Sequence, residues 1–149
     1  MPVWMSVKPR YADLILDGLK TVEVRRWLPT TIANEDTCVV YASSPTKAVL
    51  GEVRIEGIRR VRVDDNLDEL AAAARASPRE LREYLDGRDH AYLIELSNPR
   101  RYPEPVPLRE LKRIVRRELD REFHPNPLFR IDYELLNAVR SAAGLRVSL

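Results

Sequence analysis

Apolar side chains dominate residues 3–8, and this run predicts a short β-strand. Pro9 follows the run, and proline is favoured at the first position of a helix. Residues 11–17 then carry apolar side chains at helical spacing and end at Gly18, a residue type that is common just after a helix. The N-terminal segment therefore predicts a strand, a helix and a glycine turn.

Residues 20–27 alternate between polar and apolar positions, which predicts a second strand. Val22 and Val24 fall on one face of this strand, and Thr21, Glu23 and Arg25 fall on the other. We expect the valine face to pack against the core and the polar face to carry the chemistry of the protein.

Further strands are expected over residues 36–42, 48–58 and 90–96. The first two are separated by the turn-forming segment 43–47, and the strand at 48–58 continues after a bend at Gly57 to residue 63. Residues 98–107 contain too many prolines for a central strand. We expect this segment to run as an extended edge or as a loop.

Two regions of the sequence carry helix signals. An insert at about 65–87 holds an alanine-rich helix over 67–76, with Asn66 as its cap, and a second helix that starts at Ser77. Pro78 at the first helical position and Glu80 three residues after the serine support that start. A C-terminal extension at about 108–144 holds a charged helix over 108–121 and another over 131–143, ended by Gly144.

These elements lack the regular strand–helix–strand order of a doubly wound sheet and so predict an α+β fold. At 149 residues the chain has the length of one domain, and we expect residues 1–149 to form a single unit. Its 44% hydrophobic and 32% charged residues are typical of a globular protein. No run approaches the roughly 18 apolar residues of a membrane span, and no signal peptide is evident, so no membrane contact and a cytoplasmic location are expected.

Charge and cysteine usage narrow the functions further. The formal net charge of +2 does not by itself argue for a polyanionic partner, so any case for RNA rests on where the charges lie. Cys38 is the only cysteine, which excludes an internal disulfide and a multi-cysteine zinc site, and we expect it to be buried. His90 and His124 are isolated, and the glycines form neither a P-loop nor a dinucleotide fingerprint. We expect no metal and no cofactor.

Two segments resemble the ASCH superfamily. The first comprises residues 6–12 and 15–25, and its end, Gly18-Leu19-Lys20-Thr21-Val22-Glu23-Val24-Arg25, is similar to the Gly-x-Lys-Thr-x-Glu-x-Arg signature of that superfamily. The second comprises residues 40–45 and 49–53, which are similar to its second and third strands, and residues 102–108 with 128–130 add a weaker similarity. The resemblance implies a PUA-like β-barrel of five to six mixed strands with peripheral helices.

The resemblance also implies a polar cleft beside the barrel that binds RNA or a nucleotide. Arg25 would grip a phosphate or carbonyl, and Glu23 would accept a hydrogen bond from an exocyclic amine. Backbone N–H groups and hydroxyls of the serines in the 43–47 turn suit an anion. The expected ligand-binding residues are Lys8, Lys20, Thr21, Glu23, Arg25, Ser43, Ser44 and Lys47.

Three alternatives stay open for this polar set. Some ASCH-like proteins are amidohydrolases that act on acetylated cytidine, which would make Lys20, Thr21 and Glu23 catalytic, although Glu23 stands where that family has its threonine nucleophile. Others are ribonucleases, which would place Lys8, Lys20, Tyr41, Ser43 or Lys47 near the cleaved phosphate. In the structural alternative, Glu23 and Arg25 only pair with neighbours across the sheet.

The charged C-terminal helix suggests a further partner. Arg109, Arg113, Arg116 and Arg117 can share one helical face. A protein partner that docks on the basic helix 109–121 is one hypothesis, and a merely solvated helix is the alternative.

Overall fold

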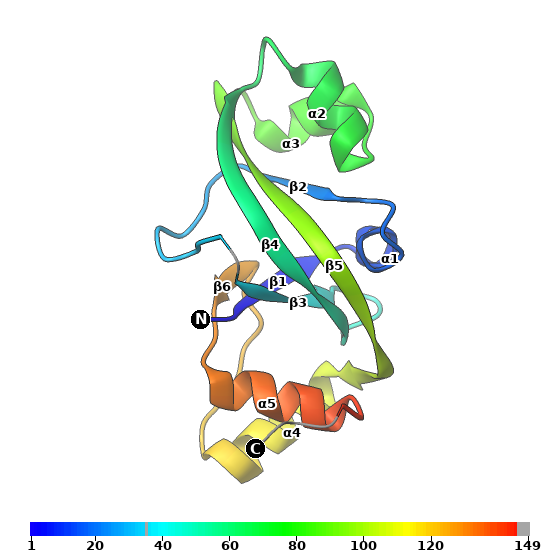
Figure 1. Cartoon of the computed structure of the whole chain (residues 1–149), viewed down its shortest axis with the longest axis vertical. Helices are drawn as coiled ribbons and strands as arrows, with labels where there is room; N and C mark the ends of the chain where they lie inside the picture. Colours follow the sequence, from blue (N-terminus) through cyan, green and yellow to red (C-terminus); the bar gives the residue numbers. More distant parts are fainter. Residues whose placement is uncertain (35, 146–149) are drawn as a thin grey trace.

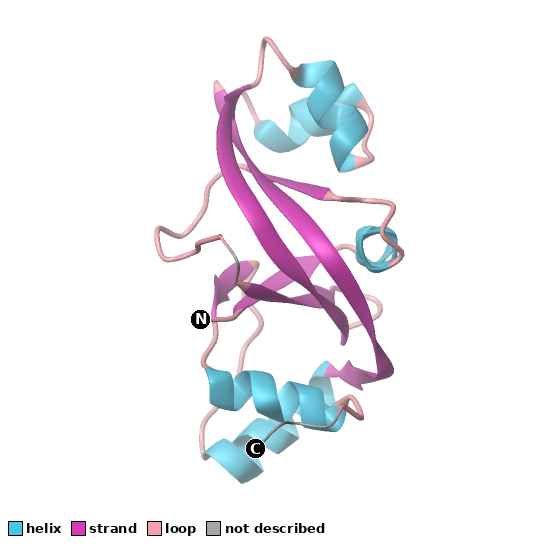
Figure 2. Cartoon of the chain, in the orientation of Figure 1, coloured by secondary structure: helices cyan, strands magenta, loops and turns pink. Residues whose placement is uncertain are grey.

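The computed structural model describes residues 1–34 and 36–145. Two helical pairs lie at opposite ends of a long, curved ribbon formed by β4 and β5 (Figure 1, Figure 2). The elements follow in the order β1 (Val3–Val7), α1 (Pro9–Leu16), β2 (Val22–Arg25), β3 (Thr37–Ala42), β4 (Ala48–Arg62), α2 (Leu67–Ala74), α3 (Pro78–Leu85), β5 (His90–Pro107), α4 (Leu108–Leu119), β6 (Leu128–Arg130) and α5 (Tyr133–Ala142).

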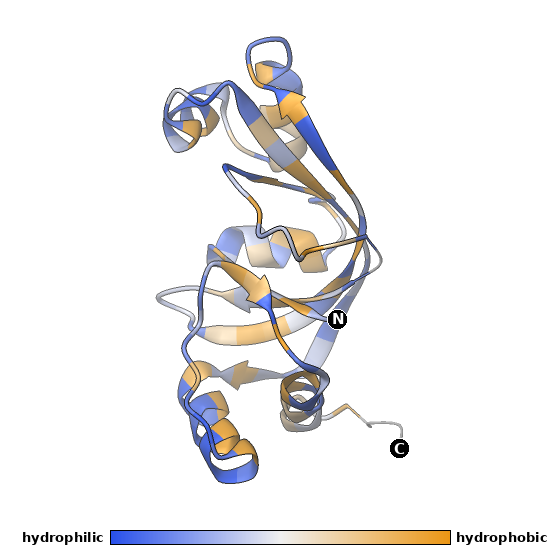
Figure 3. Cartoon of the chain, turned by 90° about the vertical axis from the view of Figure 1, so that its left-hand side faces the viewer, coloured by the Kyte–Doolittle hydropathy of each residue, from blue (hydrophilic) through white to orange (hydrophobic). Residues whose placement is uncertain are grey.

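The described strands form one mixed sheet in the order β2-β5-β4-β3-β1-β6. β1 and β3 run parallel, and the other neighbouring pairs are antiparallel. Register shifts interrupt both the β3–β4 and the β4–β5 pairing, and such bulges bend a strand and increase its twist. The sheet therefore curls into a half-barrel, as the side view shows (Figure 3).

β5 is longer than the sequence pattern predicts. It continues from His90 through the proline-rich segment to Pro107, paired with β4 along its length. Within the described residues, β2 pairs only with residues 92–95 of β5, so the proline-rich half has β4 as its single neighbour. The missing N–H groups of proline are tolerated on such an edge, which agrees with the expected extended edge.

Alternation along β1 sends neighbouring side chains into two different cores. Met5 belongs to a cluster that packs α1 against one face of the sheet, whereas Trp4 belongs to a cluster that holds α4 and α5 on the other face. A third cluster joins α2 and α3 to β2 and β5 through residues such as Val24 and Leu81. The insert thus has its own apolar contacts beside the polar face of β2.

The two helices of the insert start differently. The capping box of α3 is confirmed, because Ser77 Oγ accepts a hydrogen bond from the Glu80 N–H at 3.0 Å and Glu80 Oε1 accepts one from the Ser77 N–H at 3.2 Å. Asn66 does precede α2, but its Nδ2 donates to the Arg62 carbonyl at 3.0 Å and it makes no side-chain cap. Asn66 therefore occupies the N-cap position, as expected, but its side chain does not cap the helix.

The C-terminal extension contains one element that the pattern does not predict. Residues 128–130 form β6 beside β1, and three residues are too few for a period-two pattern to be visible. The following helix begins at Tyr133 instead of 131, because Asp132 caps it by accepting a hydrogen bond from the Leu135 N–H at 2.8 Å.

Candidate functional site

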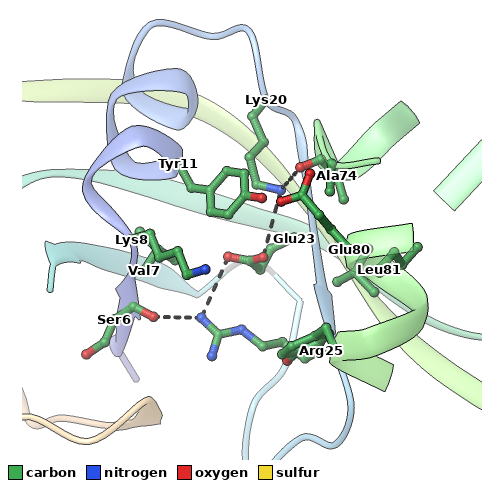
Figure 4. Close-up of a pocket in the computed structure, with 13 residues that line it drawn as sticks. Ser6, Val7, Lys8, Tyr11, Lys20, Glu23, Arg25, Ala74, Glu80 and Leu81 are labelled. Atoms are coloured by element: carbon green, nitrogen blue, oxygen red, sulfur yellow. Dashed lines mark hydrogen bonds and ion pairs between the residues drawn. The ribbon is translucent and has the colours of Figure 1, made fainter. Parts of the chain in front are cut away.

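A polar cleft of about 220 Å³ lies between α1, β2 and the α2–α3 insert. The close-up shows side chains of β2 and α1 pointing into it, with α3 closing the opposite side (Figure 4). Its lining residues are Ser6, Val7, Lys8, Tyr11, Lys20, Glu23, Val24, Arg25, Ala74, Ala76, Glu80, Leu81 and Tyr84. Four of the expected ligand-binding residues, Lys8, Lys20, Glu23 and Arg25, are therefore brought together.

Lys20 is almost completely buried, with 2% of its surface exposed. Its Nζ donates to the Ala74 carbonyl at 2.7 Å, lies 3.8 Å from Glu23 Oε1 and sits 4.9 Å from the centre of the Tyr11 ring. Burial lowers the pKa of Lys20, and nearby arginines add to this effect against the opposing attraction of Glu23. The ammonium group is thus desolvated and held in one place.

The Glu23 carboxylate lies between two cations. Lys20 faces Oε1, and Arg25 Nη2 lies 3.6 Å from Oε2. Arg25 is itself oriented by β1, because the same nitrogen donates to the Ser6 carbonyl at 2.9 Å. Glu23 is 8% exposed, so its carboxylate lies in a partly dehydrated setting where a hydrogen bond to a ligand is strong.

α1 and α3 meet across the mouth of the cleft. Arg10 Nη2 donates to the Tyr11 hydroxyl at 2.7 Å and to Glu80 Oε2 at 2.9 Å, so one guanidinium links the two helices. Tyr84 is 39% exposed on the α3 side, and Arg26 lies 5.1 Å above its ring. Lys8 is exposed at the rim and makes no ion pair with a described residue. The rim combines cations with two aromatic rings.

Sequence reasoning did not identify the residues that the insert and α1 supply. Ala74 contributes only a backbone carbonyl, which no side-chain pattern can reveal. The pattern around Glu80 predicts only a helix cap, and the pattern around Tyr11 predicts only a helix after the first strand. Tyr84 could have been identified from the sequence, because it is an aromatic residue on the polar face of an amphipathic helix and aromatic side chains are enriched at binding surfaces.

Four of the expected residues lie outside the cleft lining. Thr21 is exposed, and its carbonyl accepts a hydrogen bond from the Leu96 N–H at 2.8 Å. Ser43, Ser44 and Lys47 lie in the turn between β3 and β4, where the Ser43 N–H donates to the Val7 carbonyl at 2.8 Å. Their participation in ligand binding stays a prediction.

Other side chains singled out from the sequence have structural surroundings. Cys38 is fully buried, as expected, and burial raises the pKa of its thiol to about 12. His90 begins β5, and His124 is exposed, 3.7 Å from Glu122. Among the described residues, no group of three or more histidine, cysteine or acidic side chains could hold a metal ion. None of the described helices is both long enough and apolar enough to cross a membrane.

The ASCH domain model matches residues 5–104, which include both halves of the cleft. The chain belongs to the ASCH domain family. An ASCH domain-containing ribonuclease from Zymomonas mobilis is 32% identical over 112 residues, which are 74% of this chain and 73% of that protein. The fold and the family predicted from the sequence are thereby confirmed.

Solved ASCH structures agree with the geometry described above. The crystal structure of ASCH from Zymomonas mobilis matches this ASCH protein with a TM-score of 0.82 at 28% identity, over 94% of both chains. The N-terminal domain of Staphylothermus marinus McrB matches with a TM-score of 0.65 at 13% identity, over 93% of this chain and 92% of that one. The second likeness concerns the fold alone.

Proposed function

We propose that this ASCH protein binds RNA through the cleft and holds one nucleotide unit there. The observation that carries the proposal is the buried Glu23 carboxylate flanked by Lys20 and Arg25, with a cationic rim outside. A cavity of about 220 Å³ is smaller than the range of about 300–1,000 Å³ for drug-sized ligands. It suits one unpaired base, with the sugar and phosphate at the cationic rim, and is too small for a duplex.

The side chains of the cleft match the chemistry of a nucleotide. Glu23 would accept a hydrogen bond from an exocyclic amine or a ring N–H, whereas Arg25 and Lys8 would bind phosphate or carbonyl oxygens. Tyr11 and Tyr84 line the same cavity and offer aromatic faces on which a base can stack. RNA binding is also compatible with the cytoplasmic location expected from the sequence.

A second candidate function is cleavage of the bound RNA. It is favoured by the 32% identity to a protein described as an ASCH domain-containing ribonuclease. Lys20 has a lowered pKa and a fixed position, so it could stabilise developing charge on a phosphate or exchange a proton. Hydrolysis of an acylated nucleoside stays an alternative with Lys20, Thr21 and Glu23 as its residues, but Thr21 lies outside the cleft lining.

The proposal is tested by fluorescence anisotropy with a labelled single-stranded tetranucleotide RNA. Glu23→Gln keeps the size of the side chain but removes the charge between Lys20 and Arg25, and we expect the dissociation constant to rise by at least about tenfold. Glu104→Gln is the control, because it removes the same charge from an exposed side chain that lies outside the cleft and makes no ion pair with a described residue. Equal binding by the wild type and Glu23→Gln, with both folded, contradicts the proposal.

The same preparations separate binding from cleavage. RNA incubated with each protein is resolved on a denaturing gel, and the products are compared with those of Lys20→Met. Products that disappear with Lys20→Met but persist with Glu104→Gln support the ribonuclease. Retained RNA without products supports a binding module.

A further inference from the structure

The helix α4 has a cationic face that the cleft does not use. Leu111, Ile114 and Val115 are buried and fasten one side of the helix to the sheet. The opposite side exposes five cations, Arg109, Lys112, Arg113, Arg116 and Arg117, and the half-buried Glu110 is the one acidic residue among them in this part of the helix. Since the whole chain carries a formal net charge of only +2, this concentration of charge is local.

Three of these cations make no ion pair, unlike several other surface arginines of this protein. Arg59, Arg79 and Arg121 each contact a carboxylate, at 2.8, 3.3 and 2.7 Å. By contrast, Arg109, Lys112 and Arg113 make no ion pair within the described part of the chain. Among the described residues, the ion pairs of this helix lie at its C-terminal end, where Glu118 pairs with Arg117 and Glu122 with Arg116.

The spacing of the cations works against the helix itself. Arg109 and Arg113 are four residues apart, as are Lys112 and Arg116, and like charges at this spacing destabilise a helix by about 0.2–0.5 kcal/mol per pair. Glu110 is the one acidic residue in the N-terminal half of α4, and it makes no ion pair with these cations, so the repulsion is only partly offset. A bound polyanion would relieve it.

Backbone contacts connect this helix to the cleft. The Leu108 N–H at the start of α4 donates to the Lys47 carbonyl at 2.9 Å, and the Ser43 N–H of the same turn donates to the Val7 carbonyl at 2.8 Å. Val7 immediately precedes Lys8 at the rim of the cleft. The turn between β3 and β4 therefore joins the cleft margin to the start of α4.

We propose that single-stranded RNA leaves the cleft over Lys47 and that its phosphates bind the cationic face of α4. This inference rests on the proposed function, and it assigns a separate site for the backbone of a longer RNA. An acidic protein is the other conceivable partner. Protein interfaces centre on large hydrophobic or aromatic anchors, and none of the exposed large hydrophobic side chains of the described residues belongs to α4. The cationic face of α4 therefore fits the phosphate groups of a polyanion better than it fits the apolar centre of a protein interface.

The test compares a tetranucleotide with a single-stranded RNA of about sixteen nucleotides, the span of known single-strand sites. The triple variant Arg109→Gln, Lys112→Gln, Arg113→Gln keeps good helix formers on an exposed face and removes three positive charges. The matched control is the triple variant Arg60→Gln, Arg82→Gln, Arg88→Gln, which removes the same charge from exposed arginines that likewise make no ion pair with described residues. Circular dichroism checks that all proteins fold.

We expect the α4 variant to bind the long RNA at least about tenfold more weakly than the wild type at low salt. Its affinity for the tetranucleotide should equal that of the wild type. The slope of log affinity against log salt should become shallower by about 2, since single strands release about 0.7 counterion per neutralised phosphate. An unchanged affinity for the long RNA overturns the inference and leaves the protein partner as the better hypothesis. An equal loss in the control variant also overturns it, because net charge would then explain the effect.

The two proposals fail in different ways. If the wild type binds neither RNA, both the proposed function and this inference are wrong. If Glu23→Gln weakens the binding of both RNAs but the α4 variant weakens the binding of neither, the proposed function stands and only the α4 site is wrong.

Discussion

Arg140 Nε and Nη2 donate to the two oxygens of the Glu52 carboxylate at 3.0 and 2.7 Å, across 88 positions of the sequence. The Tyr102 hydroxyl donates to the same carboxylate at 2.8 Å. Glu52 is 7% exposed, so this bidentate ion pair holds the last helix, α5, against the β4–β5 ribbon. The sequence gives no indication of it, because none of the three residues has a local pattern that points to the others.

Arg140→Met should destabilise the fold strongly. Among the described residues it leaves the buried carboxylate with Tyr102 as its remaining hydrogen-bond donor, and breaking one side of a buried pair costs about 3–5 kcal/mol. We expect the free energy of unfolding in urea to fall by an amount near this range at pH 7. A double variant that also carries Glu52→Gln should recover part of the loss, whereas an unchanged stability of Arg140→Met would show that the pair contributes nothing.

The effect of Arg140→Met should also depend on pH. Burial opposes the charged form of Glu52, but the hydrogen bonds from Arg140 and Tyr102 outweigh it and lower the pKa below 4.5. The stability that the charged pair contributes is therefore present above pH 4.5 and is lost as the pH falls through the lowered pKa. The difference in unfolding free energy between wild type and variant should shrink in acid.

Lys20→Met should abolish the function of the cleft and change how stability depends on pH. Burial lowers the pKa of Lys20 below 10.5, so between the folded and unfolded values the unfolded chain binds more protons and stability rises with pH. Methionine cannot titrate and therefore removes this contribution to the pH dependence. Urea unfolding is measured at intervals from neutral pH to about pH 10, and the free energy of unfolding should rise more for the wild type than for Lys20→Met. If the two plots of unfolding free energy against pH run parallel, this account is contradicted.

Gly51→Ala should be poorly tolerated. A Cβ atom on Gly51 would lie 2.4 Å from the Arg100 carbonyl oxygen and 2.7 Å from Leu16 Cδ2, so backbone would have to shift. Overpacking of this kind costs about 1–3 kcal/mol. Gly57→Ala on the same strand is the matched control, because its Cβ would meet the flexible end of Glu95 at 3.2 Å. Equal melting temperatures of the two variants would contradict the prediction.

Cys38 should be unreactive in the folded protein. Its side chain is fully buried, and the pKa of the thiol is raised to about 12, so the thiolate fraction at pH 8 is very small. We expect labelling by a thiol reagent to be at least about a thousandfold slower than that of a free cysteine. Addition of urea should restore rapid labelling. Fast labelling without denaturant would mean that the third strand opens.

The sequence by itself determined the local chemistry of the cleft. Alternation along β2 places Glu23 and Arg25 on one face with a period of two, and that rule needs no partner strand. The serine cap of α3 is equally local, because Ser77 and Glu80 lie three residues apart on the first turn. Such features depend on neighbours in the chain, and pattern analysis identified them.

Only the tertiary structure decided what those residues face. Lys20 binds the carbonyl of Ala74, 54 residues away, and every residue has a carbonyl, so no side-chain signal marks this one. Ser43 and Lys47 resemble an anion-binding turn in sequence, but the pairing of β1 with β3 places their turn beside the cleft and not in it. Pairing between distant strands depends on how the whole chain closes its loops and buries its apolar surface, which local patterns do not encode.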